Sequence, residues 1–137
     1  MFQHDIQLRV RYAETDQMGF VYYGNYATYF EVARVETFRH LGFSYRSMEE
    51  SGVMMPVSEY HSKYVRPALY DDLLTIKTYI KEMPSKRIKF DYEVFNEAGI
   101  LLNLSETSLV FVNSHTKRPC QMPEAFQNML KPYFEKR

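Results

Sequence analysis

The sequence predicts an α+β fold in which an antiparallel sheet curls around one long, mostly buried helix. Residues 26–41 form a helical stretch with apolar side chains on more than one side, a pattern typical of a buried helix. Apolar and polar residues alternate in strand-like fashion before this helix and in several segments after it. The links between the later strands are short, which requires those strands to form an antiparallel meander. A single apolar helix then needs a sheet wrapped around it.

The first half of the chain supplies one strand and the helix. Residues 3–12 place Ile6 and Leu8 on one face and polar residues on the other, which predicts a strand with one buried face. A turn over 13–24 follows. Asn25 is the predicted N-cap of the helix, and Gly42 is a suitable residue just after its C-terminus.

The second half supplies the rest of the sheet. A short polar helix or turn is expected over 44–51, before the first of four strands. Asn96 to Gly99 reads as a hairpin turn, and Pro123 is expected to open a short amphipathic helix. The four strands are predicted over residues 53–66, 72–82, 86–96 and 100–112.

The length, composition, net charge and cysteine count of the chain limit the classes of protein to which it can belong. The 137 residues, of which 45% are hydrophobic, fit one globular domain over residues 1–137. The formal net charge is zero, which gives no reason to expect a nucleic-acid partner or a membrane surface. Cys120 is the only cysteine, so no intrachain disulfide can form, and the start of the chain lacks the pattern of a signal peptide. A cytoplasmic location is therefore the expectation.

The turn before the long helix carries the strongest chemical signal. Asp16 lies in a Gly-containing turn that leads into a helix N-terminus. Such an end presents unpaired N–H groups and a partial positive charge. A carboxylate beside it can attack a carbonyl or activate water while the helix end polarises that carbonyl. This combination predicts acyl transfer, with hydrolysis of a thioester as the preferred reaction and the backbone from Tyr23 through Gly24 to Asn25 as the oxyanion site.

Other side chains complete the predicted site. The segment after Asp16 is unusually apolar for a surface loop, which suggests that it lines a substrate pocket. The predicted substrate-binding residues there are Val21, Tyr22, Asn25 and Tyr26. Lys86 and Arg87 open a later strand and could bind the phosphates of coenzyme A. The alternative is a solvated strand face, because any outward face carries such charges. No pair of histidines has metal-ligand spacing, so no metal and no cofactor are expected.

These residues also carry a resemblance to a known family. The chain resembles the 4-hydroxybenzoyl-CoA thioesterase family of hotdog proteins over nearly its whole length. The matching positions are Arg11, Tyr12, Thr15, Asp16, Gly19, Val21, Tyr22, Asn25, Tyr26, Glu31, Ala33, Arg34 and Glu36, followed by Tyr64, Pro67, Asp72, Leu74, Ile76, Met122 and Pro123.

The resemblance implies a hotdog fold, hydrolysis of an acyl-CoA, Asp16 as the catalytic carboxylate and the Tyr23 N–H as the group that polarises the thioester. It also implies a homodimer or homotetramer with the active site between subunits. The Tol-Pal-associated short-chain branch usually has His where this chain has Tyr23. At the basic cluster for CoA, Pro84 and Ser85 stand in place of two arginines, and Lys86 remains.

Two other readings stay open. A thioesterase acting on acyl carrier protein would share the scaffold and ignore free acyl-CoA. A non-catalytic hotdog module would bind a CoA ester or a protein partner without turnover.

Overall fold

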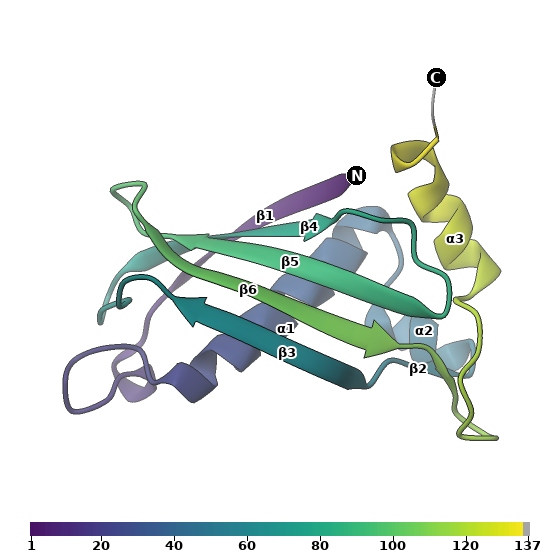
Figure 1. Ribbon diagram of the computed structural model, residues 1–137, viewed down its shortest axis with the longest axis horizontal. Coiled ribbons are helices and arrows are strands. Elements are labelled where there is room, and N and C mark those ends of the chain that lie inside the picture. The colour runs from purple at the N-terminus through teal and green to yellow at the C-terminus, as the bar shows by residue number, and fades with distance from the viewer. Residues whose placement is uncertain (136–137) are drawn as a thin grey trace.

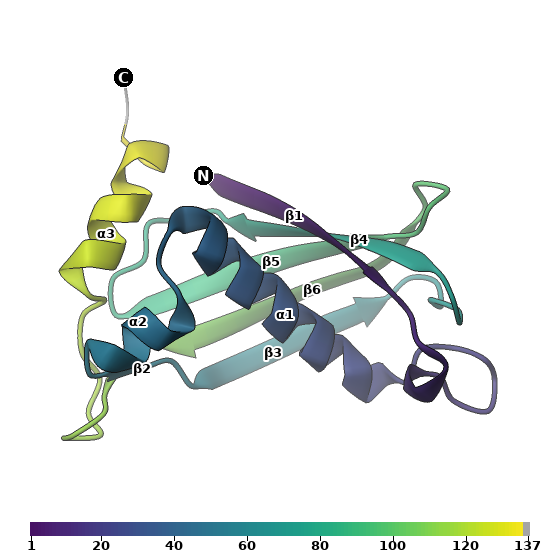
Figure 2. The same ribbon diagram turned by 180° about the vertical axis from the view of Figure 1, so that it is seen from behind.

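The computed structural model describes residues 1–135 and has the expected α+β architecture. A five-stranded antiparallel sheet in the order β1-β4-β5-β6-β3 lies across one side of the helix α1 (Figures 1 and 2). This arrangement confirms the predicted hotdog fold. The strands are β1 (Phe2–Arg9), β2 (Val53–Met54), β3 (Val57–Tyr64), β4 (Leu73–Ile80), β5 (Arg87–Phe95), β6 (Leu101–Val110) and β7 (Val112–Asn113), and the helices are α1 (Tyr23–Leu41), α2 (Tyr45–Glu50) and α3 (Glu124–Leu130), with short 3-10 turns η1 (Tyr12–Glu14) and η2 (Lys131–Tyr133).

Aromatic side chains on one side of the helix α1 pack it against the sheet. Tyr26, Phe30 and Phe38 are buried against the sheet, and the Phe30 ring stacks on Tyr92 of β5 at a centroid distance of 4.3 Å. Burial of a side chain this large contributes roughly 1.5–3 kcal/mol. The helix ends at Gly42, whose φ of +88° is left-handed and whose N–H donates to the Arg39 carbonyl, as the sequence predicted.

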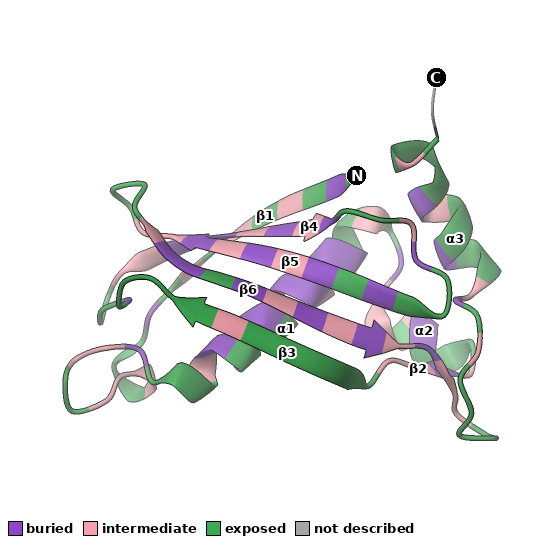
Figure 3. Ribbon diagram, viewed as in Figure 1, coloured by how far each residue is buried: buried purple, intermediate pink, exposed green. Residues whose placement is uncertain are grey.

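The inner and outer faces of the sheet differ sharply. Along β4 and β5, alternate residues are buried toward α1, while the residues between them face the opposite side (Figure 3). The buried set includes Leu74, Ile76, Ile80, Ile88, Phe90, Tyr92 and Val94. This is the period-2 pattern of a strand with one face on the core. The outer face carries ion pairs such as Lys89 with Glu106.

The predicted strand over 53–66 is wrong in two respects. It is two strands, because the chain breaks at Met55 and Pro56, and proline has no N–H to donate to a ladder. Moreover, β3 does not pair with β4, the next strand in sequence. It pairs with β6 at the far edge of the sheet, so only β4, β5 and β6 form a consecutive meander. The free edge of β3 is exposed almost throughout (Figure 3).

The helices within residues 1–135 include none that is long and apolar enough to cross a membrane. The same residues contain no cluster of three or more His, Cys, Asp or Glu side chains arranged to hold a metal ion.

Candidate active site

The loop that carries Asp16 is a closed turn. Thr15 and Val21 form an isolated antiparallel bridge, and the Asp16 N–H donates to the Phe20 carbonyl at 2.8 Å. Gly19 has a φ of +78°, a left-handed conformation in which a side chain would be strained. The glycine therefore allows the chain to reverse directly after Asp16.

The turn orients the Asp16 carboxylate. Its Oδ1 accepts hydrogen bonds from the N–H groups of Met18 and Phe20, at 2.9 and 3.2 Å. Within residues 1–135, Oδ2 accepts no hydrogen bond and the carboxylate forms no ion pair. One oxygen thus holds the side chain in place, and the other is available for chemistry.

The start of α1 differs from the prediction in a way that favours an anion site. The helix begins at Tyr23, and its N-cap is Tyr22, which makes no side-chain capping bond. The Asn25 N–H donates to the Tyr22 carbonyl, whereas the N–H groups of Tyr23 and Gly24 donate to no acceptor among residues 1–135. Two free N–H donors and the helix dipole therefore meet at this end.

The predicted N-cap role of Asn25 is wrong. Asn25 is the third residue of the helix, and its side chain donates from Nδ2 to the Glu14 carbonyl at 2.8 Å. The Tyr22 N–H donates to the same carbonyl at 2.9 Å. Asn25 therefore ties the helix start to the residues before Asp16. No pattern in the sequence indicates this contact, because it joins Asn25 to a residue eleven positions earlier.

Glu14 is a positioning residue that the sequence analysis missed. Its side chain is largely buried and accepts hydrogen bonds from the Arg11 N–H, the Arg11 guanidinium and the Tyr29 hydroxyl. Burial alone would raise the pKa of Glu14, but the hydrogen bonds from Arg11 and Tyr29 outweigh it, so the pKa lies below its usual value. The charged carboxylate therefore joins the start of η1 to α1. Its position in a predicted turn carried no signal of that role.

Replacing Tyr29 with Phe tests this link. The variant should lose about 1–2 kcal/mol of unfolding free energy at pH 7, because a hydrogen bond to a charged group is removed. Since the folded-state pKa of Glu14 is lowered from 4.5, its contribution is present above that pH and disappears as the pH falls through the folded-state value. Denaturant titrations of both proteins at pH 7 and pH 3 should show the difference shrinking in acid. A difference independent of pH would contradict the link.

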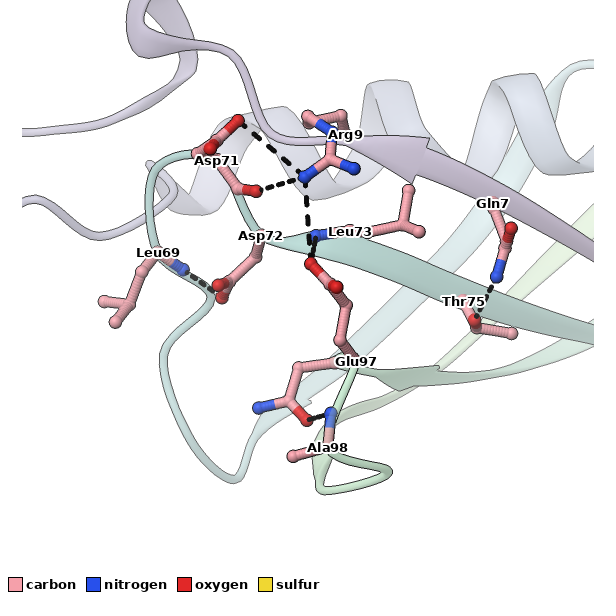
Figure 4. Close-up of polar contacts among 10 residues, drawn as sticks. Gln7, Arg9, Leu69, Asp71, Asp72, Leu73, Thr75, Glu97 and Ala98 are labelled. Atoms are coloured by element: carbon pink, nitrogen blue, oxygen red, sulfur yellow. Dashed lines mark hydrogen bonds and ion pairs between the residues drawn. The ribbon is translucent and has the colours of Figure 1, made fainter.

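The other side of the loop rests on the segment that precedes β4. The Val21 N–H donates to the Ala68 carbonyl at 2.8 Å, and Phe20 forms a bridge with Leu69. That segment is anchored in turn by Arg9, whose Nη1 donates to the Asp71 carbonyl at 2.8 Å and lies 3.7 Å from Glu97 (Figure 4). The Asp72 carboxylate accepts from the Leu69 N–H at 2.9 Å (Figure 4). The Asp16 loop is thus held on both flanks.

The structure brings some of the predicted site residues together and separates others. Asp16, Tyr23, Gly24 and Asn25 belong to one loop–helix unit. Val21 and Tyr26 are buried beside it, while the Tyr22 and Tyr23 rings pack on each other at 4.6 Å and remain exposed.

Lys86 and Arg87 are not part of this unit. They lie where β5 begins, next to the end of β6, whereas the Asp16 loop lies beyond the opposite end of the sheet (Figure 1). The length of β5 alone separates the two ends by about 27 Å at roughly 3.3 Å per residue. A charged hollow of about 670 Å³ occupies the outer face of the sheet between Lys81, Asp91 and Glu106, and none of the predicted site residues lines it.

Known proteins are similar to this chain both in sequence and in fold. Residues 10–130 match the family described as the thioesterase-like superfamily. The chain is 35% identical over 127 residues to YneP of Bacillus subtilis, which is provisionally named an acyl-CoA thioesterase, covering 93% of this chain and 92% of that protein. It is 33% identical over 118 residues to the acyl-CoA thioester hydrolase YbgC of Escherichia coli O6:H1, covering 86% and 88% of the two chains. The solved DHNA-CoA thioesterase from Staphylococcus aureus superposes with a TM-score of 0.89 at 36% identity, covering 97% and 89%.

Proposed function

The chain belongs to the thioesterase-like superfamily, and from that premise we propose that it is an acyl-CoA thioesterase whose reacting group is the Asp16 carboxylate. The proposal depends on one observation: among residues 1–135, Oδ2 of Asp16 accepts no hydrogen bond, and its loop is tied to a helix end where the N–H groups of Tyr23 and Gly24 have no acceptor. The relatives named as acyl-CoA thioesterases support the substrate class.

The proposed step begins with the thioester carbonyl oxygen facing the N–H groups of Tyr23 and Gly24. As the tetrahedral intermediate forms, negative charge develops on this oxygen. Hydrogen bonds from backbone N–H groups and the helix dipole stabilise that charge more than they stabilise the neutral carbonyl. One such donor is typically worth about 3–4 kcal/mol of transition-state stabilisation.

Asp16 can serve by either of two routes. As a nucleophile, Oδ2 bonds to the carbonyl carbon, the C–S bond breaks, CoA leaves as a thiolate that takes up a proton, and water then hydrolyses the mixed anhydride. As a general base, Oδ2 takes a proton from water while the water oxygen bonds to the same carbon, and the C–S bond breaks afterwards. Both routes consume one water and yield one carboxylic acid and one CoA thiol.

We also propose that the active protein is a homo-oligomer built through β3. This edge strand has unpaired backbone groups and exposes the Val57, Tyr60 and Tyr64 side chains. An exposed, partly apolar edge invites pairing with another strand, and a two-fold axis would pair β3 with its own copy. We assign the predicted phosphate contacts of Lys86 and Arg87 to a neighbouring protomer, because in their own chain they lie at the far end of the sheet from Asp16.

Light scattering after size exclusion tests the β3 interface. We expect a mass of two or four times the chain mass of 16.4 kDa. Replacing His61, at the middle of β3, with Glu places like charges near each other across the two-fold axis and beside Glu59. The dimer dissociation constant should then rise about 5-fold, since opposed like charges cost up to about 1 kcal/mol. Gln7→Glu, on the other edge strand, makes the same charge change and should leave the dissociation constant unaltered. A monomeric wild type would contradict the interface.

The catalytic proposal is tested by thiol release from a panel of short, medium, long and aromatic acyl-CoA esters. Turnover of at least one ester is expected. Turnover of acyl carrier protein esters alone would identify a carrier-protein thioesterase. Binding of every CoA ester without thiol release would identify a non-catalytic module, and either result would overturn the proposal.

A further inference from the structure

Gly24, the second residue of α1, is a glycine that its backbone does not require. Its conformation is that of an ordinary helix, without the positive φ that favours glycine at Gly19 and Gly42. Alanine is more favourable than glycine in a helix. The reason for a glycine at this position must therefore be space.

The ring of Tyr22 occupies that space. A Cβ atom on Gly24 would lie 2.8 Å from Cε2 and 3.2 Å from Cδ2 of Tyr22, closer than the roughly 3.5–4.0 Å at which carbon atoms pack. The Tyr22 ring also packs on the Tyr23 ring, at a centroid distance of 4.6 Å. The ring thus contacts both of the residues that follow it in the chain.

Hydrogen bonds of its backbone hold Tyr22 in this place. Its N–H donates to the Glu14 carbonyl, and its carbonyl accepts from the Asn25 N–H, both at 2.9 Å. The side chain is 47% exposed, so the ring can turn away without opening the core. The backbone is therefore fixed, and the ring is the part that can move.

The ring flanks the proposed oxyanion site. The N–H groups of Tyr23 and Gly24, which have no acceptor among residues 1–135, run roughly parallel to the helix axis. The Cα–Cβ direction points outward and tilts toward the helix N-terminus. The Cβ position and the amide nitrogen of Gly24 are bonded to the same Cα atom, so a ring against that position lies beside the N–H.

The Tyr22 side chain brings no charge to this end of the helix. A hydrogen bond with the Tyr23 hydroxyl raises the pKa of Tyr22, so its hydroxyl is neutral at neutral pH. The ring edge that faces Gly24 consists of C–H groups, which are not hydrogen-bond acceptors. It can therefore exclude water without competing for the N–H groups.

We propose that Tyr22 is a positioning residue whose ring screens the N–H groups of Tyr23 and Gly24 from water and keeps them free for the thioester oxygen. The missing side chain of Gly24 allows the ring to lie there. The inference rests on the proposed thioesterase function. Donors shielded from water stabilise a developing charge more strongly, and that charge is largest in the transition state, so the ring should raise kcat rather than lower KM.

Steady-state kinetics on the best ester of the panel test the role of the ring. Tyr22→Ala should lower kcat about 10-fold, less than the 10²- to 10³-fold that loss of a whole donor costs, and should change KM less than about 3-fold. Tyr22→Phe keeps the ring and should retain kcat within about 2-fold. Tyr70→Ala removes another exposed tyrosine, whose ring contacts Tyr12, and should leave both constants unchanged.

Gly24→Ala tests the contact itself. The added methyl group leaves both N–H groups in place but cannot coexist with the Tyr22 ring in its present position, so kcat should fall about 5- to 10-fold. In a Tyr22→Ala background the same change should alter kcat less than about 2-fold, because residues in contact have non-additive effects. Since alanine favours a helix, the thermal midpoint should not fall. An equal loss of kcat with and without the Tyr22 ring would contradict the inference.

Hydrogen exchange measures the screening without the reaction. In water-exchange NMR, the N–H groups of Tyr23 and Gly24 should exchange at least 5-fold faster in Tyr22→Ala than in the wild type, after correction for the rates of unstructured peptides of the same sequences. The Asn25 N–H keeps its bond to the carbonyl of residue 22 and should stay within about 2-fold. Unchanged exchange at Tyr23 and Gly24 would reject the screening.

These measurements separate the inference from the proposed function. If the wild type hydrolyses no ester, the thioesterase proposal fails, and the exchange rates still decide whether Tyr22 screens the helix end. If the wild type is active, a rise in KM with unchanged kcat in Tyr22→Ala would overturn the inference, because the ring would then only bind substrate. An equal loss of kcat in Tyr22→Phe and Tyr22→Ala would also overturn it, because the hydroxyl rather than the ring would be responsible.

Discussion

Replacing Asp16 with Asn should lower kcat/KM for acyl-CoA hydrolysis by about 10²- to 10⁴-fold, the range typical for loss of a positioned base. Asn matches Asp in shape, and its amide oxygen can still accept from the N–H groups of Met18 and Phe20. An amide, however, is neither a nucleophile nor a base at neutral pH. The loss should appear in thiol-release assays on the best ester of the panel.

The controls for this variant separate chemistry from folding. The thermal midpoint of Asp16→Asn should lie within a few degrees of the wild type, because both turn hydrogen bonds remain. Asp71→Asn is a matched variant on a neighbouring turn: its φ of +67° is one that Asn tolerates, and its activity should stay within about 2-fold. Full activity in correctly folded Asp16→Asn would remove Asp16 from the mechanism.

Replacing Phe38 with Ala should destabilise the protein by about 3–5 kcal/mol, the usual cost of deleting a buried aromatic ring. Phe38 is fully buried, and its ring lies 4.9 Å from Tyr45, 5.8 Å from Phe90 and 5.0 Å from Phe126. These neighbours belong to α2, the sheet and α3. The cavity would thus loosen three elements at once, because cores relax only partly around a deleted side chain.

Denaturant and thermal unfolding measure this effect. The midpoint temperature should fall by roughly 10–20 °C for a chain of this size. Val32→Ala, on the same helix but 44% exposed, should cost less than about 1 kcal/mol. A loss of less than about 1 kcal/mol of unfolding free energy in Phe38→Ala would mean that the ring is not needed to pack α2, the sheet and α3 together.

Local patterns in the sequence predicted much of the fold. The alternation along β4 and β5, the apolar length of α1 and its end at Gly42 follow from backbone periodicity and from the conformational freedom of glycine, both of which are properties of neighbouring residues. The family was also predicted, on positions concentrated around Asp16, and the match over residues 10–130 confirms it. The catalytic role of Asp16 stays a prediction.

The tertiary structure alone decided which distant segments meet. Strand order depends on pairing between residues far apart in the chain, so β3 could be placed beside β6 only in the folded sheet. The same holds for Glu14, whose partner Tyr29 lies on another element. It also holds for Lys86 and Arg87, which lie at the end of the sheet opposite the Asp16 loop. Periodicity specifies which face of an element is buried. It does not specify which element covers that face, because that choice is made by packing over the whole chain.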